Sequence, residues 1–203
     1  PDADVALKFF NSDGSTSGTC GNATRCVARY EMDRLNVDSL TLTTERGMLF
    51  AHTTNNTVSV NMGHPLLAWN EIPLAKKMDT LHLPLNGSPT ATGMGNPHCT
   101  FFVENAELDN LEKLAPDIET NPLFPERTNV QFAHKISKDH LRARVWERGV
   151  GVTLASGSSS CAVAVASARL GLTERKVQVD LDGGTIYVDW RSDGVWMSGD
   201  TLH

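Results

Sequence analysis

Positive charge is scarce in this 203-residue sequence, which has a net charge of −6 and a pI near 5.6. Nucleic-acid-binding domains concentrate Lys and Arg in basic patches, so we expect no nucleic-acid partner. No apolar run approaches the roughly 20 residues that a helix needs to span a bilayer, so we expect no membrane partner. Cysteine is also sparse. Four cysteines in a chain that can build a sizeable core favour reduced thiols and a cytoplasmic location over a disulfide framework.

The motifs of several kinds of catalysis are missing as well. The sequence has no C-x2-C or H-x3-H spacing, so no metal site is predicted. No lysine lies in any of the motifs described below, which argues against a Schiff base with pyridoxal phosphate. Ser156 does not fit the Gly-x-Ser-x-Gly elbow of a hydrolase nucleophile, because Leu154 occupies the position of the first Gly.

The sequence does contain two segments with the same layout. One runs from Phe10-Asn11 to Cys20-Gly21-Asn22, and the other runs from Trp146-Glu147 to Ser156-Gly157-Ser158. In each, an aromatic and a polar residue end a strand-like run. A small nucleophilic side chain follows nine positions after the polar residue, and Gly and a helical stretch come next. An offset of about 136 continues through the later strands, so that Leu40–Leu42 corresponds to Val177–Val179. A long period repeated only twice is typical of a duplicated domain.

This repeat predicts two domains. Residues 1–66 form an N-terminal half-domain, and residues 67–203 form a C-terminal domain whose last few residues could return to the first. The first copy is shorter by several tens of residues, and the chain starts at Pro1 close to the apolar run Val5–Leu7. We therefore interpret the sequence as an incomplete copy of a longer two-domain protein, in which the first domain lacks part of its structure.

Local patterns predict many short strands and few helices. Four segments alternate between apolar and polar residues with period two, as half-buried strands do: 40–42, 58–62, 177–181 and 186–190. Turn residues separate them at 55–56, 182–184 and 192–194.

Three other segments predict helices. Residues 20–35 place Cys26, Val27, Tyr30 and Leu35 on one helix face, and a weaker pattern covers 108–114. Residues 158–170 are small and apolar all round, which is typical of a helix enclosed by sheet. The predicted fold class is α+β, with one principal helix surrounded by strands in each half.

Cys20 is the most informative candidate for catalysis. The helix dipole and the free backbone N–H groups at a helix N-terminus stabilise a thiolate. The same N–H groups, from Gly21-Asn22 and Gly157-Ser158, can hold a carboxylate. Two facing sites of this kind would grip one carboxylate and place a proton carrier on each side of the adjacent carbon. Taken by itself, Cys20 could instead be a small packing residue. We interpret the other three cysteines, Cys26, Cys99 and Cys161, as buried packing residues.

Several motifs occur in the order and with the separations found in diaminopimelate epimerases, a family that this chain resembles over essentially its whole length. They are Thr19–Cys26, Met62-Gly63-His64-Pro65, Gly95-Asn96-Pro97-His98, Phe124–Val130, Trp146–Gly151 and Ala155–Ser158. The resemblance implies two pseudo-symmetric domains, each a mixed, barrel-like β-structure around a central helix. It also implies that no cofactor is used and that two catalytic cysteines face each other across a cleft.

The resemblance also implies roles for particular residues. Cys20 matches the first catalytic cysteine, and His98 and Glu147 match residues that poise the cysteines for proton transfer. The remaining matches bind substrate: Asn11, Asn96, Asn129 and Arg148 at the distal amino acid centre, and Gly21, Asn22, Gly157 and Ser158 at the carboxylate beside the reacting carbon. Glu147 is also among the substrate-binding residues.

Ser156 departs from the family, which has its second cysteine at this position. A thiol has a pKa near 8.5, whereas a hydroxyl is far less acidic and is a poor base without a partner. Three interpretations of Ser156 remain open: an engineered substitution that traps substrate, a natural variant with altered chemistry, and a divergent binding protein.

The predicted function is epimerisation of LL-diaminopimelate to meso-diaminopimelate, a step toward lysine and peptidoglycan precursors, with Ser156 as a source of impairment. The alternatives are a racemase of a single amino acid such as histidine and a non-catalytic amino-acid-binding homologue. The expected partner is the small-molecule substrate, and a homodimer is left open.

Overall fold

The computed structural model describes residues 3–10, 16–17, 21–45, 47–54, 57–107 and 110–200. Three helices are present in these ranges: α1 (Gly21–Leu35), α2 (Leu111–Glu119) and α3 (Gly157–Arg169). The strands are β1 (Val5–Ala6), β2 (Phe9–Phe10), β3 (Thr16–Ser17), β4 (Ser39–Thr44), β5 (Gly47–Thr54), β6 (Thr57–Asn61), β7 (Thr90–Gly93), β8 (Pro97–Phe102), β9 (Asn129–Ser137), β10 (His140–Glu147), β11 (Gly151–Thr153), β12 (Lys176–Leu181), β13 (Gly184–Arg191) and β14 (Gly194–Gly199). The fold class is mixed α+β, as predicted, and within the described ranges no helix is both long and apolar enough to cross a membrane.

Most strands belong to one twelve-stranded sheet. Its order is β1-β4-β5-β6-β14-β13-β12-β10-β9-β8-β7, with β11 attached to β10, while β2 and β3 form a separate pair. The two copies of the sequence repeat meet where β6 pairs antiparallel with β14, with Val60 opposite Met197. On each side of this junction the strands follow in mirrored order, β4-β5-β6 against β12-β13-β14. The four strands and the turns at 182–184 and 192–194 that the sequence predicts are confirmed, and the turn at 55–56 lies outside the described residues.

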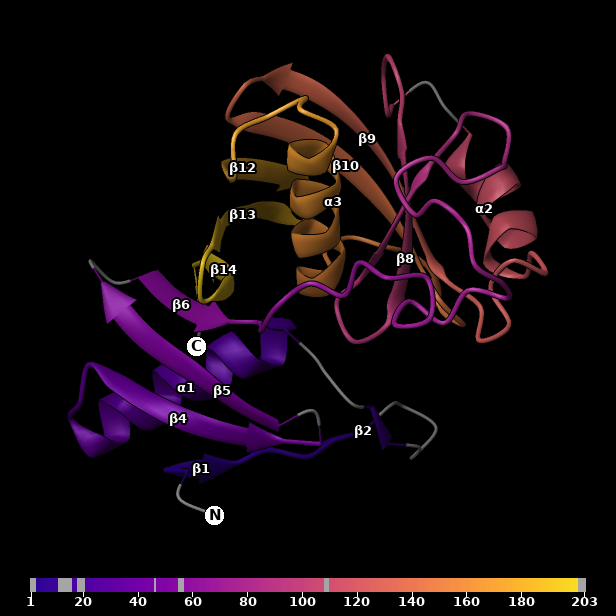
Figure 1. The fold of residues 1–203 in the computed structure, drawn as a ribbon. Coiled ribbons are helices and arrows are strands. Elements are labelled where there is room, and N and C mark those ends of the chain that lie inside the picture. Colours follow the sequence, from indigo (N-terminus) through magenta and orange to yellow (C-terminus); the bar gives the residue numbers. More distant parts are fainter. Residues whose placement is uncertain are drawn as a thin grey trace.

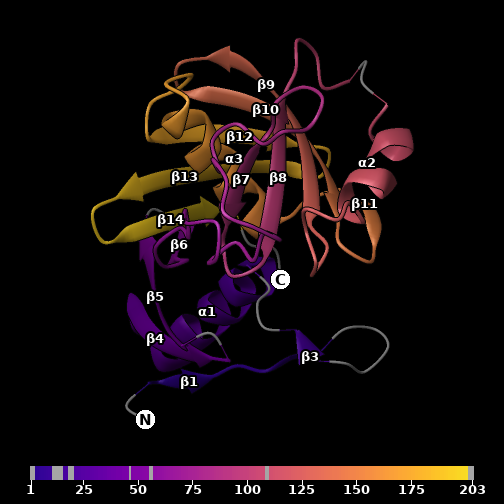
Figure 2. The ribbon, with the colours of Figure 1, turned by 45° about the vertical axis from the view of Figure 1, so that its right-hand side comes forward.

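Each copy packs its strands around its own helix (Figure 1). Helix α1 lies against β4, β5 and β6, whereas α3 contacts β7, β8, β9, β10, β12, β13 and β14. Figure 2 shows β7 and β8 passing in front of α3. Every residue of α3 from Gly157 to Ser167 is buried, and all of them are small or β-branched. This confirms the predicted enclosed helix, because only small side chains fit a helix that strands approach from several directions.

The prediction for α1 is correct in extent and wrong about its buried face. The buried residues are Gly21, Thr24, Arg25, Ala28 and Met32. By contrast, Cys26 is exposed, and Tyr30 and Leu35 are 57% and 42% exposed. The reason is tertiary: Arg25 Nη1 lies 3.4 Å from Met197 Sδ of β14, so a charged residue has its partner in the other half of the chain.

The weaker helix prediction, over 108–114, needs a larger correction. Helix α2 begins at Leu111 and continues to Glu119, with Leu108 outside the described residues. Asn110 sets the start, since its Oδ1 accepts a hydrogen bond from the Lys113 N–H at 3.1 Å. Pro116 lies inside this helix. Helix α2 packs against β9 and β10, next to a second apolar core that includes Phe124 and Phe132.

Candidate functional site

The N-termini of α1 and α3 meet at two glycines. A Cβ built on Gly157 would lie 3.3 Å from the Gly21 Cα and only 2.7 Å from Met197 Sδ. No side chain larger than hydrogen fits there without a shift, so the close approach of the two helices requires both glycines. The two helix ends carry partial positive charge and repel each other. An anion beside both ends would offset this repulsion and accept hydrogen bonds from their unpaired N–H groups.

Ser156 lies at the N-cap of α3 and is 6% exposed. Its backbone is extended, with φ −144° and ψ 119°, and its side chain makes no capping hydrogen bond. The Ser156 carbonyl accepts from the Ser160 N–H at 3.0 Å and from Ser160 Oγ at 2.9 Å. A serine at this position usually caps the N–H groups of the first turn. Here those groups are left for another acceptor, and Ser158, which follows Gly157 in the first turn, is also buried.

Two predicted site residues, Cys20 and Asn11, lie outside the described residues. Asn22 is half-buried in the first turn of α1, where its Oδ1 accepts a hydrogen bond from Arg25 Nη1 at 3.2 Å. The buried guanidinium of Arg25 therefore adds positive charge beside the start of α1.

His98 lies on β8, is fully buried, and belongs to a polar network. Its Nε2 lies 2.9 Å from Asn96 Oδ1, and its Nδ1 lies 3.0 Å from Gln131 Nε2. Gln131 Nε2 also donates to Ser159 Oγ at 3.1 Å, and Gln131 Oε1 accepts from Thr100 Oγ1 at 3.1 Å. The network thus joins β8 and β9 to the first turn of α3.

Gln131 lies outside the sequence motifs, although its position on β9 carries a signal. Gln131 follows Asn129 by two positions on β9, so both side chains lie on the same side of the strand. All four residues in the network with His98 carry neutral polar side chains, which are common throughout the sequence. Composition therefore gave no reason to single them out.

Asn129 connects the two loops that carry the other candidates. It is 3% exposed, its Nδ2 donates to the Pro97 carbonyl at 2.9 Å, and its Oδ1 accepts from the Arg148 N–H at 2.9 Å. Arg148 is exposed, and its Nη1 donates to the Glu126 carbonyl at 2.9 Å. Glu147 is half-buried at the end of β10. The amide of Asn129 therefore holds the Glu147-Arg148 turn close to the loop before His98.

Glu119, at the end of α2, is a buried carboxylate that the sequence did not reveal. Its Oε2 accepts from Trp146 Nε1 at 2.7 Å, and its Oε1 accepts from the Gly149 N–H at 2.9 Å. Arg127 Nη1 lies 3.5 Å from the same Oε1. These contacts lie on both sides of Glu147 and Arg148, so Glu119 fixes the turn that carries them.

The described cysteines differ in exposure. Cys99 and Cys161 are fully buried, as predicted, and burial raises the pKa of both thiols, that of Cys161 to about 12. Their thiolates are therefore suppressed at neutral pH. Cys26 corrects the prediction, because it lies on the exposed side of α1. The described residues contain no group of three or more His, Cys, Asp or Glu side chains that could hold a metal ion.

Comparison with known proteins places the chain in a family. The family model described as diaminopimelate epimerase matches residues 1–67 and 90–202. The chain is 46% identical to the diaminopimelate epimerase of Rhodospirillum centenum over 205 residues, which cover 98% of this chain and 70% of that protein. It is 48% identical to the enzyme of the same name from Gluconobacter oxydans over 198 residues, which cover 97% of this chain and 74% of that protein.

Solved structures share the fold at low sequence identity. A probable proline racemase from Agrobacterium radiobacter matches with a TM-score of 0.69 and 14% identity, over 98% of this chain and 70% of that chain. A protein of the PhzF family from Bacillus anthracis matches with a TM-score of 0.66 and 15% identity, over 98% of this chain and 78% of that chain. The fold and the relatives define an isomerase of the epimerase class. More specifically, the chain belongs to the diaminopimelate epimerase family.

Proposed function

We propose that this chain epimerises LL-diaminopimelate to meso-diaminopimelate in lysine biosynthesis, with the α-carboxylate bound between the N-termini of α1 and α3. One observation carries the proposal: Gly21 and Gly157 bring two helix N-termini into contact. Because the helix ends meet, the N–H groups of both halves of the chain can donate hydrogen bonds to the same carboxylate. As the α-proton leaves, negative charge spreads into that carboxylate, and preorganised donors stabilise it.

The proposed proton carriers lie at the same two helix ends. Cys20 immediately precedes α1 and Ser156 immediately precedes α3. In the proposed mechanism the Cys20 thiolate removes the α-proton, and a donor on the opposite face returns a proton to invert the carbon. His98 and Glu147 are proposed to poise these groups.

The proposed substrate contacts fall into two sets. Gly21, Asn22, Gly157 and Ser158 surround the carboxylate beside the reacting carbon. Asn11, Asn96, Asn129 and Arg148 bind the distal centre, where Arg148 offers a planar fork to the second carboxylate. Glu147 also contacts the substrate. The link between Asn129 and the Arg148 backbone supports this grouping, because it keeps the two residues together.

Ser156 supports a second candidate, a homologue that binds amino acids without turning them over. A hydroxyl is a poorer proton carrier than a thiol. Incubation with diaminopimelate in deuterium oxide separates the two. An enzyme with Cys20 as a working base exchanges the α-hydrogen for deuterium even when inversion is slow, and Cys20→Ser should abolish that exchange. Binding without any exchange would favour the homologue.

A racemase of a single amino acid is the same-class alternative. Histidine or lysine would leave the distal polar groups unpaired, at a cost of about 1–3 kcal/mol for each buried one. Calorimetric titration with diaminopimelate, lysine and histidine distinguishes these substrates, since equal affinity for all three would contradict the distal-site assignment. Several other features remain proposals from the sequence: the division into 1–66 and 67–203, turnover without a cofactor, no nucleic-acid partner, a homodimer and a cytoplasmic location.

A further inference from the structure

The amide of Gln131 has all its hydrogen-bonding groups in use within the core. Its two N–H hydrogens point to two acceptors, His98 Nδ1 at 3.0 Å and Ser159 Oγ at 3.1 Å. Its carbonyl oxygen accepts a hydrogen bond from the Thr100 hydroxyl at 3.1 Å. An amide nitrogen has no acceptor lone pair, so the His98 nitrogen that faces it must be the unprotonated one. Since Gln131 is fully buried, water cannot replace any of these contacts.

This arrangement assigns the proton of His98. In a neutral imidazole one nitrogen accepts and the other donates, so Nε2 carries the hydrogen. Nε2 lies 2.9 Å from Asn96 Oδ1, which is an acceptor, and the assignments at the two nitrogens therefore agree. A tautomer with the proton on Nδ1 would set N–H against N–H at Gln131 and leave two lone pairs facing each other at Asn96.

The same logic extends to Asn96. Because its Oδ1 accepts from His98, the amide NH2 is the group that remains for other partners. Within the described part of the chain, this NH2 makes no hydrogen bond, and the residue is half-buried in the Gly95–His98 loop beside Asn129. An NH2 held in this way can donate to an acceptor on a ligand, and a carboxylate oxygen is one such acceptor.

We propose that Gln131 is a positioning residue that holds His98 as the Nε2–H tautomer and so presents the Asn96 amide as a donor to a ligand carboxylate. The identity of that carboxylate, the distal group of an amino acid substrate, rests on the proposed function. The tautomer itself does not, because the contacts exist in the protein without ligand. Neither a charge nor a motif marks Gln131 in the sequence.

Nitrogen NMR on the ligand-free, 15N-labelled protein tests the proposal. Long-range proton–nitrogen spectra separate protonated from unprotonated ring nitrogens, and His98→Gln identifies the His98 signals. We expect Nδ1 to be unprotonated and Nε2 protonated in the parent protein. A parent spectrum with the proton on Nδ1 would overturn the proposal without any variant of Gln131.

Gln131→Glu adds a second, independent readout. A carboxylate of nearly the same shape can only accept, so Nδ1 of His98 should gain a proton and its resonance should move to the protonated range. Unchanged His98 signals, with the introduced carboxyl shown to be ionised by its 13C shift, would also overturn the proposal. Gln178→Glu is the matched control, because Gln178 Nε2 lies 3.3 Å from His140 Nε2 on β10. This variant should shift the His140 ring-nitrogen signals and leave those of His98 unchanged. Absence of epimerisation by the parent protein, measured in a separate assay, would count against the proposed function and leave the tautomer result standing.

Discussion

Gly157 at the start of α3 is in van der Waals contact with Gly21 at the start of α1, and the Met197 side chain packs against both. Met197 belongs to β14, which pairs with β6 at the junction of the two repeats. The backbone of two helices, a strand junction and a thioether are thus packed together at one point. Any added atom must displace one of them.

The first prediction concerns this contact. Gly157→Ala places a methyl 2.7 Å from Met197 Sδ, so we expect the free energy of unfolding to fall by about 1–3 kcal/mol. Urea denaturation measures it. Adding Met197→Ala should recover part of the loss, because the sulfur is then absent, and the double-mutant cycle isolates this coupling. An unchanged stability of Gly157→Ala alone would show that the contact is looser than described.

The second prediction concerns Ser156. Replacing the hydroxyl with a thiol supplies the second proton carrier, so Ser156→Cys should raise the rate of epimerisation by about 10²–10⁴-fold, the usual contribution of a positioned acid or base. Chiral chromatography of the diaminopimelate isomers measures the rate. Cys20→Ser made in the same background should remove the gain. A parent protein that already epimerises as fast as Ser156→Cys would refute the need for two thiols.

The third prediction concerns the turn braced by Glu119. Glu119→Gln keeps the shape but replaces one acceptor oxygen with an NH2, so either Trp146 Nε1 or the Gly149 N–H loses its partner. We expect a loss of about 1–3 kcal/mol in unfolding free energy and faster hydrogen exchange at Gly149. Glu112→Gln, on the same helix, is the control, because the Glu112 side chain that pairs with Arg144 is 52% exposed and ion pairs of exposed groups contribute about 1 kcal/mol or less. Equal effects of the two substitutions would contradict the bracing role.

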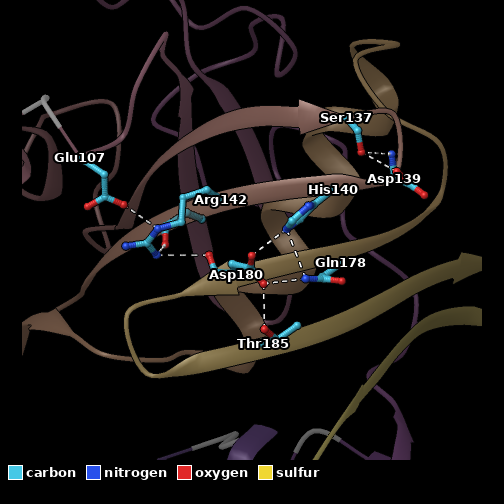
Figure 3. Close-up of polar contacts among 9 residues, drawn as sticks. Glu107, Ser137, Asp139, His140, Arg142, Gln178, Asp180 and Thr185 are labelled. Carbon is cyan, nitrogen blue, oxygen red and sulfur yellow. Dashed lines mark hydrogen bonds and ion pairs between the residues drawn. The ribbon is translucent and has the colours of Figure 1, made fainter.

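The fourth prediction concerns pH and the polar cluster on β10, β12 and β13 (Figure 3). Partial burial raises the pKa of Asp180, but hydrogen bonds from Gln178, His140 and Thr185 outweigh it, and the net pKa is below the ordinary value of 3.8. A carboxyl with a lowered pKa in the folded state stabilises the protein above pH 3.8, and that contribution is lost as the pH falls through the folded-state pKa.

Asp180→Asn should therefore lower the midpoint temperature of unfolding at pH 7. It should also reduce the loss of stability between about pH 5 and pH 2, the range in which a carboxylate of this kind titrates. Thermal denaturation at several pH values measures both effects. Thr185→Val removes one donor to Asp180 and should act in the same direction with a smaller size. A steeper acid dependence in Asp180→Asn would have the wrong sign for this account.

The fifth prediction concerns thiol reactivity. Cys20 should be alkylated by iodoacetamide first, because a helix N-terminus stabilises its thiolate. Exposed Cys26 should follow, and Cys99 and Cys161 should react only after unfolding, since both are fully buried with raised pKa values. Mass spectrometry of timed digests gives the order. Labelling of Cys99 or Cys161 before Cys26 in the native protein would contradict the described burial.

Local patterns in the sequence determined a large part of this fold. Alternating residues are enough to specify β12 and β13, because one side of each strand faces α3 and the other side is accessible to water. The small residues of α3 specify an enclosed helix, because a helix that is apolar all round cannot face solvent. The repeat of these patterns, together with the ordered motifs, also determined the family.

Only the tertiary structure decided which polar residues are buried and what they hold. Arg25 is buried beside Met197, the Glu119 carboxylate accepts hydrogen bonds from Trp146 and Gly149, and three strand and helix residues surround the Gln131 amide. Each of these partners is distant in the sequence. A buried polar group is stable only when its hydrogen bonds are satisfied, and satisfaction depends on positions that chain folding brings together. Periodicity records which side of an element is apolar, and it carries no record of such partners.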